Sequence, residues 1–265
     1  MNELSNLSSP KRISTGIGGL DALLQGGFLP GRSYLVSGEA GSGKTTACLH
    51  FLLAGLKNSE KSVYVTVDEK PAEILQSAAS LNWNLQSYVQ DKSLVILDAS
   101  PYFTGRATAI GEKEIDLPRF VTELGEYANK MSATRLAIDP MTPLVVPRDS
   151  SAHIQTNTRA LIHLLQAHLP TTNLLTAQIA NSANHDSTIE EFITAGVIVL
   201  STNTNKDRLV RTLRIKKMRA TAVDPSEYFF TIAKSEGIAL ISPEQKPLVQ
   251  RETLKGLEFF ELPRE

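Results

Sequence analysis

The segment GEAGSGKTT at residues 38–46 constrains this chain more than any other, because its backbone path suits few residue types. Gly38, Gly43, Lys44 and Thr45 fit the spacing G-x-x-x-x-G-K-[ST] of a phosphate-binding loop. In such a loop several backbone N–H groups converge on phosphate oxygens, and side chains at the tight points would obstruct them. An apolar run, SYLVS, precedes the segment and an amphipathic stretch follows it. The sequence therefore predicts a nucleotide phosphate site between a strand and a helix.

The chemistry of such a loop gives its residues separate roles. Lys44 is expected to reach the β- and γ-phosphates, and the Thr45 hydroxyl to be a ligand of Mg²⁺. The helix that begins near Gly43 adds the positive end of its dipole. We expect ATP or ADP to contact the whole loop, namely Gly38, Glu39, Ala40, Gly41, Ser42, Gly43, Lys44, Thr45 and Thr46.

Polar side chains also stand at the ends of other apolar runs. TRLAID ends in Asp139, which is expected to hold the magnesium ion with its water shell, although an Asp there is also a common turn residue. SVYVTVDEKP places Asp68 and Glu69 where a strand leaves the sheet, so either carboxylate can accept a proton from the attacking water. The alternative for this pair is a solvated acidic turn. Gln178, late in LLTAQIA, either senses the γ-phosphate or satisfies a buried backbone group.

Apolar runs alternate with segments of helical spacing along most of the chain. One such segment places Leu49, Leu52, Leu53 and Leu56 on a single stripe. This alternation predicts an α/β fold with a mostly parallel central sheet and helices on both faces. RLVRTLRIKKMRA and EYFFTIA predict antiparallel strands at the C-terminal edge. The runs that predict buried strands lie at 33–38, 62–67, 93–100, 134–139, 173–180 and 196–201.

Composition excludes several other classes of protein. A net charge of -1 gives no overall field toward nucleic acid or membrane. Cys48 is the only cysteine, so the sequence has neither a disulfide framework nor a multi-cysteine zinc site. No segment has the roughly 20 consecutive apolar residues of a membrane span, and the first residues lack a signal-peptide core. The expected location is the cytoplasm, without a membrane partner.

Beyond the loop, a series of segments resembles the KaiC-like family of RecA-type ATPases, and in particular the first domain of the cyanobacterial clock protein. TGIGGLDALLQGGFLPGRSYLVSGEAGSGKTT resembles the opening of such a domain. The later matches, in order, are VTVDEKPAEI, SLNWNL, KSLVILDASP, RLAIDPMTPL, EEFITAGVIVL, LRIKKMRAT and EYFFTIA. The resemblance implies a RecA-like P-loop core at 12–242, between tails at 1–11 and 243–265. It also implies a ring, usually a hexamer, with ATP bound between subunits.

The resemblance assigns roles to residues outside the loop as well. Asp139 falls on the family's magnesium position, and Asp68 and Glu69 fall on its paired catalytic carboxylates. The clock protein has Glu-Glu at that pair, and the shorter Asp68 would stand about an ångström further from the water. A misplacement of that size costs about a hundredfold in rate, so hydrolysis is slow unless Glu69 shares the work.

LRIKKMRAT matches the segment that reaches the nucleotide of a neighbouring subunit. It assigns Lys217, Met218 and Arg219 to nucleotide binding, with Lys217 and Arg219 as the catalytic cations. These two are two residues apart and face the same way on a strand, while Met218 faces opposite. A solvated basic strand is the alternative. Where the second domain of the clock protein has a phosphorylated Ser-Thr pair, this chain has Glu191 and Phe192.

Three functions are consistent with these observations. The first is Mg²⁺-dependent ATP binding and hydrolysis at the interfaces of a ring-shaped homo-oligomer that couples its nucleotide state to a protein partner. The second is a RecA-like DNA-binding ATPase; however, the segments after Asp139 and Gln178 contain few of the cations and aromatics that bind single strands. The third, suggested by Asp68, is a scaffold that binds ATP with negligible turnover. The DNA-binding function is favoured only by Arg208, Arg211, Arg214, Lys216, Lys217 and Arg219.

Overall fold

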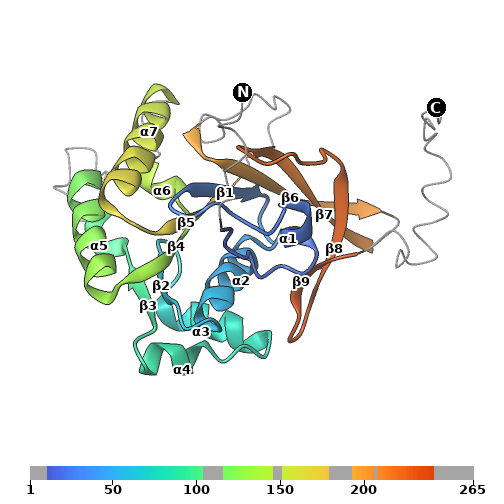
Figure 1. Cartoon of the computed structure of the whole chain (residues 1–265), viewed down its shortest axis with the longest axis horizontal. Helices are drawn as coiled ribbons and strands as arrows, with labels where there is room; N and C mark the ends of the chain where they lie inside the picture. The colour runs from blue at the N-terminus through green and yellow to red at the C-terminus, as the bar shows by residue number, and fades with distance from the viewer. Residues whose placement is uncertain (1–10, 104–115, 146–150, 179–192, 206–207, 242–265) are drawn as a thin grey trace, which may run out of the picture.

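A single nine-stranded sheet runs through the computed structural model, which describes residues 11–103, 116–145, 151–178, 193–205 and 208–241 (Figure 1). The strand order is β3-β2-β4-β5-β1-β6-β7-β8-β9. Neighbours from β3 to β6 are parallel, and those from β6 to β9 are antiparallel. The strands are β1 Ser33–Gly38, β2 Lys61–Thr66, β3 Leu94–Asp98, β4 Ala133–Asp139, β5 Thr172–Gln178, β6 Gly196–Asn205, β7 Arg208–Met218, β8 Glu227–Ala233 and β9 Gly237–Leu240. The predicted α/β fold and its antiparallel edge are confirmed.

Helices cover both faces of the parallel part of the sheet. Helices α1 to α4 pack on one face and α5 to α7 on the other, and the two faces carry separate buried clusters. Tyr34 belongs to one cluster and Leu35 to the other, as expected for a strand that is buried on both sides. The helical elements are α1 Leu20–Leu23, α2 Lys44–Leu56, α3 Pro71–Ser80, α4 Leu85–Gln90, the 3-10 turn Ser100–Phe103, α5 Leu117–Met131, α6 Thr142–Val145 and α7 Ser151–His168.

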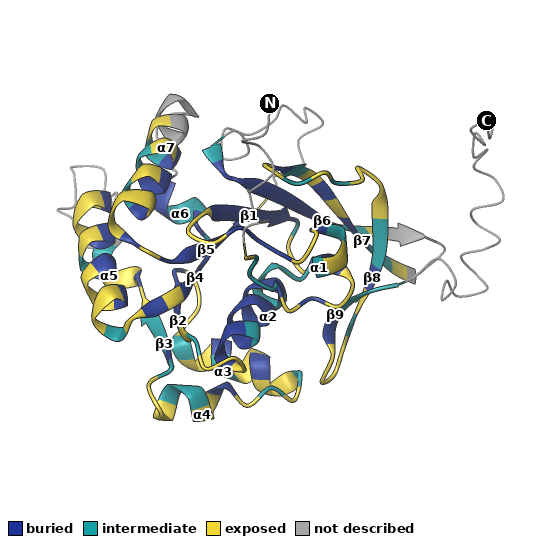
Figure 2. Cartoon of the chain, in the orientation of Figure 1, coloured by how far each residue is buried: buried dark blue, intermediate teal, exposed yellow. Residues whose placement is uncertain are grey.

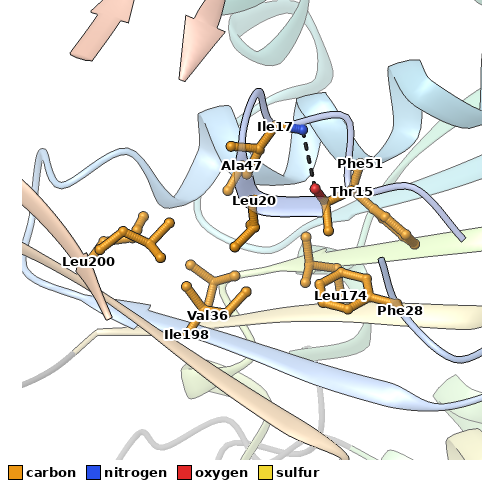
Figure 3. A pocket seen from close by; sticks show the side chains of 11 residues that line it. Thr15, Ile17, Leu20, Phe28, Val36, Ala47, Phe51, Leu174, Ile198 and Leu200 are labelled. Carbon is orange, nitrogen blue, oxygen red and sulfur yellow. Dashed lines mark hydrogen bonds between the residues drawn. The ribbon is translucent and has the colours of Figure 1, made fainter. Parts of the chain in front are cut away.

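Burial follows this layering, with buried residues along the sheet and on α2 and exposed positions on the outer sides of α5, α7, α3 and α4 (Figure 2). A small cavity remains in the core beneath α1 and α2, and its lining includes Leu20, Val36 and Leu174 (Figure 3). The one polar side chain on its wall, Thr15, accepts a hydrogen bond from the Ile17 N–H at 3.2 Å. Room for about one water and an apolar lining mark it as a packing defect of the core.

The β8–β9 hairpin is fastened to helix α2 and to the turn between α3 and α4. The Ile238 N–H donates to His50 Nε2 at 2.7 Å, and Trp83 Nε1 donates to the Ser235 carbonyl at 3.1 Å. Gly237 has a φ of 69°, and a Cβ there would overlap both His50 and Trp83. Trp83 is half-buried, packs against the buried cluster on this face of the sheet and anchors the hairpin.

The His50 contact predicts a stability that depends on pH. Burial lowers the pKa of His50 to about 4, and the charge of Lys57 acts in the same direction. Because the folded state holds this proton less tightly than the unfolded state, the stabilisation is complete above about pH 6.5. It is lost as pH falls toward 4, by on the order of 3 kcal/mol.

Urea unfolding at pH 7 and pH 4.5 measures this effect. The His50→Gln variant, which keeps a hydrogen-bond acceptor but does not titrate, is expected to lose less stability over that interval than the wild type. Equal losses in the two proteins would contradict a neutral, buried His50.

Candidate functional site

The phosphate-loop motif lies at the carboxyl end of β1, the middle strand of the nine-stranded sheet. Helix α2 begins at Lys44, within the motif and next to Gly43 as predicted, and Gly43 is its N-cap. Gly41 and Gly43 have φ values of 75° and 106°, in the left-handed region that favours glycine. A Cβ on Gly38 would overlap the Leu200 carbonyl of β6, so the loop could not approach that strand with a larger residue. Ligands of open α/β sheets bind at this edge.

Lys44 is held over the backbone of the loop. Its Nζ donates to the Gly38 carbonyl at 3.0 Å and to the Glu39 carbonyl at 2.8 Å. Burial lowers the pKa of Lys44, and the carboxylate of Asp139 partly opposes that shift. The Glu39 carboxylate accepts a hydrogen bond from the Thr202 hydroxyl of β6 at 2.9 Å. Thr202 therefore holds the one acidic side chain of the loop against β6.

Asp139 lies at the end of β4 beside the loop and is buried. The Thr45 hydroxyl donates to its Oδ2 at 2.6 Å, so the two predicted magnesium ligands are in contact. The Tyr64 hydroxyl donates to the same oxygen at 2.7 Å, and the Thr176 hydroxyl donates to Oδ1. Sequence reasoning missed Tyr64 and Thr176, whose only signal is a hydroxyl within an apolar strand.

The oxygen donors at this position fit a magnesium ion. A hydroxyl and a carboxylate in contact are hard ligands, and Mg²⁺ usually takes one or two such groups while phosphates and water supply the rest. Over the described residues, no group of three His, Cys, Asp or Glu side chains could hold a metal by itself. The donor set therefore suits an ion that arrives with a nucleotide.

Asp68 and Glu69 follow β2, and the last residue of that strand, Thr66, pairs with Asp139 in the sheet. The Thr66 hydroxyl donates to the Glu69 carbonyl at 2.6 Å and fixes the turn. Both carboxylates are exposed, yet partial burial and the nearby Asp139 raise the pKa of each. Glu73 and Asp68 add to the rise in the pKa of Glu69. Such a pair holds a proton more tightly than ordinary surface carboxylates do, as a general base requires.

Gln178 ends β5 directly beside Gly38, and its side chain is exposed. That position favours contact with a bound phosphate over a role inside the core.

Lys217, Met218 and Arg219 lie far from the loop of their own chain. Met218 pairs with Gly196, and Gly196 pairs with Tyr34 at the start of β1. The loop begins four residues further along β1, which is roughly 13 Å away. The phosphate loop is therefore at the carboxyl end of β1, whereas Lys217, Met218 and Arg219 lie near its amino end.

The three side chains at this edge have different surroundings. Lys217 Nζ donates to the Thr194 carbonyl at 2.9 Å, and the Met218 side chain is buried in its own core. A contact of Met218 with a neighbour's nucleotide would therefore be made by its backbone. Arg219 is exposed just past the end of β7, and its backbone N–H donates to the Ala195 carbonyl at 2.8 Å.

Several predicted features lie outside the described residues. These are both tails, Glu191 and Phe192, and the segments at 146–150 and 179–192 that bear on DNA binding, together with the side chain of Arg208. In the part that is described, no helix is long and apolar enough to cross a bilayer.

Comparisons with known proteins point to one family. Residues 13–245 match the family described as "ATPase: KaiC". The chain is 35% identical over 245 residues to the circadian clock oscillator protein KaiC of Parasynechococcus marenigrum (strain WH8102), which covers 91% of this chain and 47% of that protein. It is 34% identical over 245 residues to the protein of the same name from Prochlorococcus marinus (strain MIT 9313), covering 91% and 48%. The chain thus spans about half the length of the curated relatives it matches.

A solved structure is similar over most of the chain. It is that of a KaiC-like protein from the hyperthermophilic archaeon Pyrococcus horikoshii OT3, with a TM-score of 0.73 and 28% sequence identity. The match covers 87% of this chain and 99% of the archaeal one.

Proposed function

Because the chain belongs to the KaiC family of ATPases, we propose that it binds ATP with Mg²⁺ and hydrolyses it at interfaces between copies of itself. The loop at 38–46 binds the phosphates, with Lys44 on the β- and γ-phosphates. Thr45 and Asp139 hold Mg²⁺, which neutralises charge on the phosphates when bound. Gln178, beside Gly38, contacts the γ-phosphate.

Asp68 and Glu69 take the proton in the reaction. Water attacks the γ-phosphorus, its proton passes to a carboxylate of this pair, and the bond to the β,γ-bridging oxygen breaks to release ADP and phosphate. The turn after β2 supports this assignment, because it presents both carboxylates at the same sheet edge as the loop. Glu69 and Asp68 share this role.

The observation that carries the proposal is the distance between the two halves of the site. Lys217 and Arg219 lie near the amino end of β1, and their own loop lies at its carboxyl end. Only another copy of the chain can therefore bring them to the phosphates. An interface that joins one end of the strands to the opposite end in the next copy is head-to-tail, and such an interface forms a ring when the rotation between copies closes. A hexamer is the ring that the family resemblance implies.

The alternatives have less support. DNA binding rests on the basic strand β7. Arg214 on this strand is exposed, but the Lys217 ammonium already donates to the Thr194 carbonyl. A scaffold without turnover rests on Asp68 alone. We place the protein in the cytoplasm because its single cysteine, Cys48, is buried in α2 and fits a reducing compartment. Its output is a nucleotide-dependent contact with a protein partner.

Steady-state phosphate release tests the proposal. The wild type is expected to release phosphate from ATP in the presence of Mg²⁺ and to stop when EDTA is added. Lys44→Ala is expected to lose at least about a hundredfold in rate, because no other side chain of the loop supplies a cation to the phosphates. Lys57→Ala, at the far end of the same helix, is the matched control and is expected to keep the wild-type rate.

Particle mass tests the oligomer separately. Measured with ADP and with a non-hydrolysable ATP analogue, the mass is expected to be a multiple of the 28.9 kDa chain in at least one nucleotide state. A monomer in both states that still releases phosphate at the wild-type rate would contradict an interface site.

A further inference from the structure

The Asp139 carboxylate is held from both sides of its strand. Tyr64 lies on β2 and Thr176 on β5, the two strands that flank β4. Their hydroxyls donate to Oδ2 and Oδ1 respectively, so each carboxylate oxygen has a donor that comes from outside the loop. The Thr45 hydroxyl shares Oδ2 with Tyr64. A carboxylate with both oxygens engaged has one orientation rather than several.

Neither Tyr64 nor Thr176 is placed to touch a nucleotide. Tyr64 is 1% exposed and Thr176 is 0% exposed, whereas Lys44 and its neighbours Gly43 and Thr45 are partly exposed. Tyr64 pairs with Ala137, two residues before Asp139, and its ring extends toward the carboxyl edge of the sheet to meet the carboxylate. Both hydroxyls therefore act through Asp139.

We propose that Tyr64 and Thr176 are positioning residues that set the Mg²⁺ affinity of the site by fixing the Asp139 carboxylate, an inference that rests on the proposed function. Hydrogen bonds to a ligating group orient that group and raise the affinity of its metal, and their removal typically costs 10- to 100-fold. The Thr45 hydroxyl belongs to the loop and is itself a predicted ligand of the ion. Tyr64 and Thr176 come from outside the loop and hold the carboxylate without being ligands themselves.

A merely structural role for the two hydroxyls makes a different prediction. A buried hydroxyl needs a hydrogen-bond partner. In a merely structural role, Asp139 would be the acceptor that satisfies the Tyr64 hydroxyl, and Tyr64 would not orient Asp139. Removing the hydroxyl would lower the stability of the fold without changing how the site responds to Mg²⁺. The two roles are separated by measuring ADP affinity as a function of Mg²⁺ concentration, with no need for turnover.

Calorimetric titration of ADP, in EDTA and at graded Mg²⁺ concentrations, is the direct test. Tyr64→Phe and Thr176→Val are each expected to raise by about tenfold the Mg²⁺ concentration at which ADP affinity is half-enhanced. ADP affinity in EDTA is expected to stay within about twofold of the wild type. Thr176→Ser keeps the hydroxyl and is expected to restore the wild-type midpoint.

Tyr34→Phe is the matched control. The Tyr34 hydroxyl is also buried, but it accepts from the Leu29 N–H at 2.8 Å and donates to the Leu29 carbonyl, away from Asp139. Tyr34→Phe is expected to lose a comparable amount of stability in urea and to keep the wild-type Mg²⁺ midpoint.

Each outcome has a defined meaning. A wild-type midpoint in both Tyr64→Phe and Thr176→Val overturns the inference, and so does a shift of equal size in Tyr34→Phe. If Tyr64→Phe does not fold, Thr176→Val and Thr176→Ser decide the matter. A wild-type chain whose ADP affinity does not respond to Mg²⁺ contradicts the proposed function itself, and the inference then falls with it.

Discussion

Replacing Arg219 with alanine is expected to lower the steady-state rate of phosphate release by about a thousandfold, while ADP affinity in EDTA stays within severalfold of the wild type. A guanidinium supplied by a neighbouring subunit stabilises the charge that develops on the γ-phosphate, and it matters most in the transition state. The exposed position of Arg219 past the end of β7 suits contact with another copy. Arg214→Ala, at an exposed arginine of the same strand, is the control and is expected to keep the wild-type rate.

A mixing experiment separates action in trans from action within one chain. Lys44→Ala removes the loop cation but keeps Arg219, and Arg219→Ala does the reverse. When the two inactive variants are mixed and allowed to exchange subunits, about a quarter of the interfaces combine an intact loop with an intact arginine. Activity is therefore expected to return in part. A mixture as inactive as its components, in particles shown to have exchanged, would contradict a head-to-tail site.

Replacing the acidic pair, Asp68→Asn with Glu69→Gln, is expected to lower turnover by about 10²- to 10⁴-fold without weakening the binding of Mg²⁺ and ADP. Neither amide can take the proton of the attacking water. Asp98→Asn is the matched control, because Asp98 ends the neighbouring strand β3 at the same edge of the sheet. An unchanged rate in the double variant would show that this pair is a solvated turn.

The same pair makes a prediction about pH. Partial burial and the nearby Asp139 raise the pKa of Asp68 and of Glu69. A general base works only when deprotonated, so turnover is lost as pH falls through these raised values, at a higher pH than for ordinary carboxylates. Asp68→Glu lengthens the side chain by one methylene and is expected to raise turnover, by up to about a hundredfold if reach limits the rate.

Much of the fold could be predicted from the sequence because its strands are buried on both faces. The six apolar runs from 33–38 to 196–201 each contain a strand, since a strand between two helical layers has no polar side to interrupt the run. The phosphate loop could also be predicted from the sequence. Gly38 is required because the backbone of β6 approaches it closely, and Gly43 is required because its φ is positive.

The contacts around Asp139 could not be predicted from the sequence. Tyr64 and Thr176 meet this carboxylate only because the sheet order is β2-β4-β5, and the spacing of residues along the chain does not fix strand order. The hydrogen bond of Trp83 could not be predicted for the same reason, since its partner is a hairpin some 150 residues later in the chain. The separation of Arg219 from its own loop likewise follows from the pairing of β7 with β6.

In the proposed function, the amide groups and Lys44 of the 38–46 loop bind the phosphates of a nucleotide, with Mg²⁺ held by Thr45 and Asp139. Calorimetric titration of Mg-ADP into the folded wild-type chain and into Lys44→Ala measures this most directly. We expect a saturable heat for the wild type, with an affinity that falls when EDTA removes the metal, and an affinity at least about tenfold weaker for Lys44→Ala. A folded wild-type chain that gives no heat of binding, or a Lys44→Ala variant with the wild-type affinity, would contradict it.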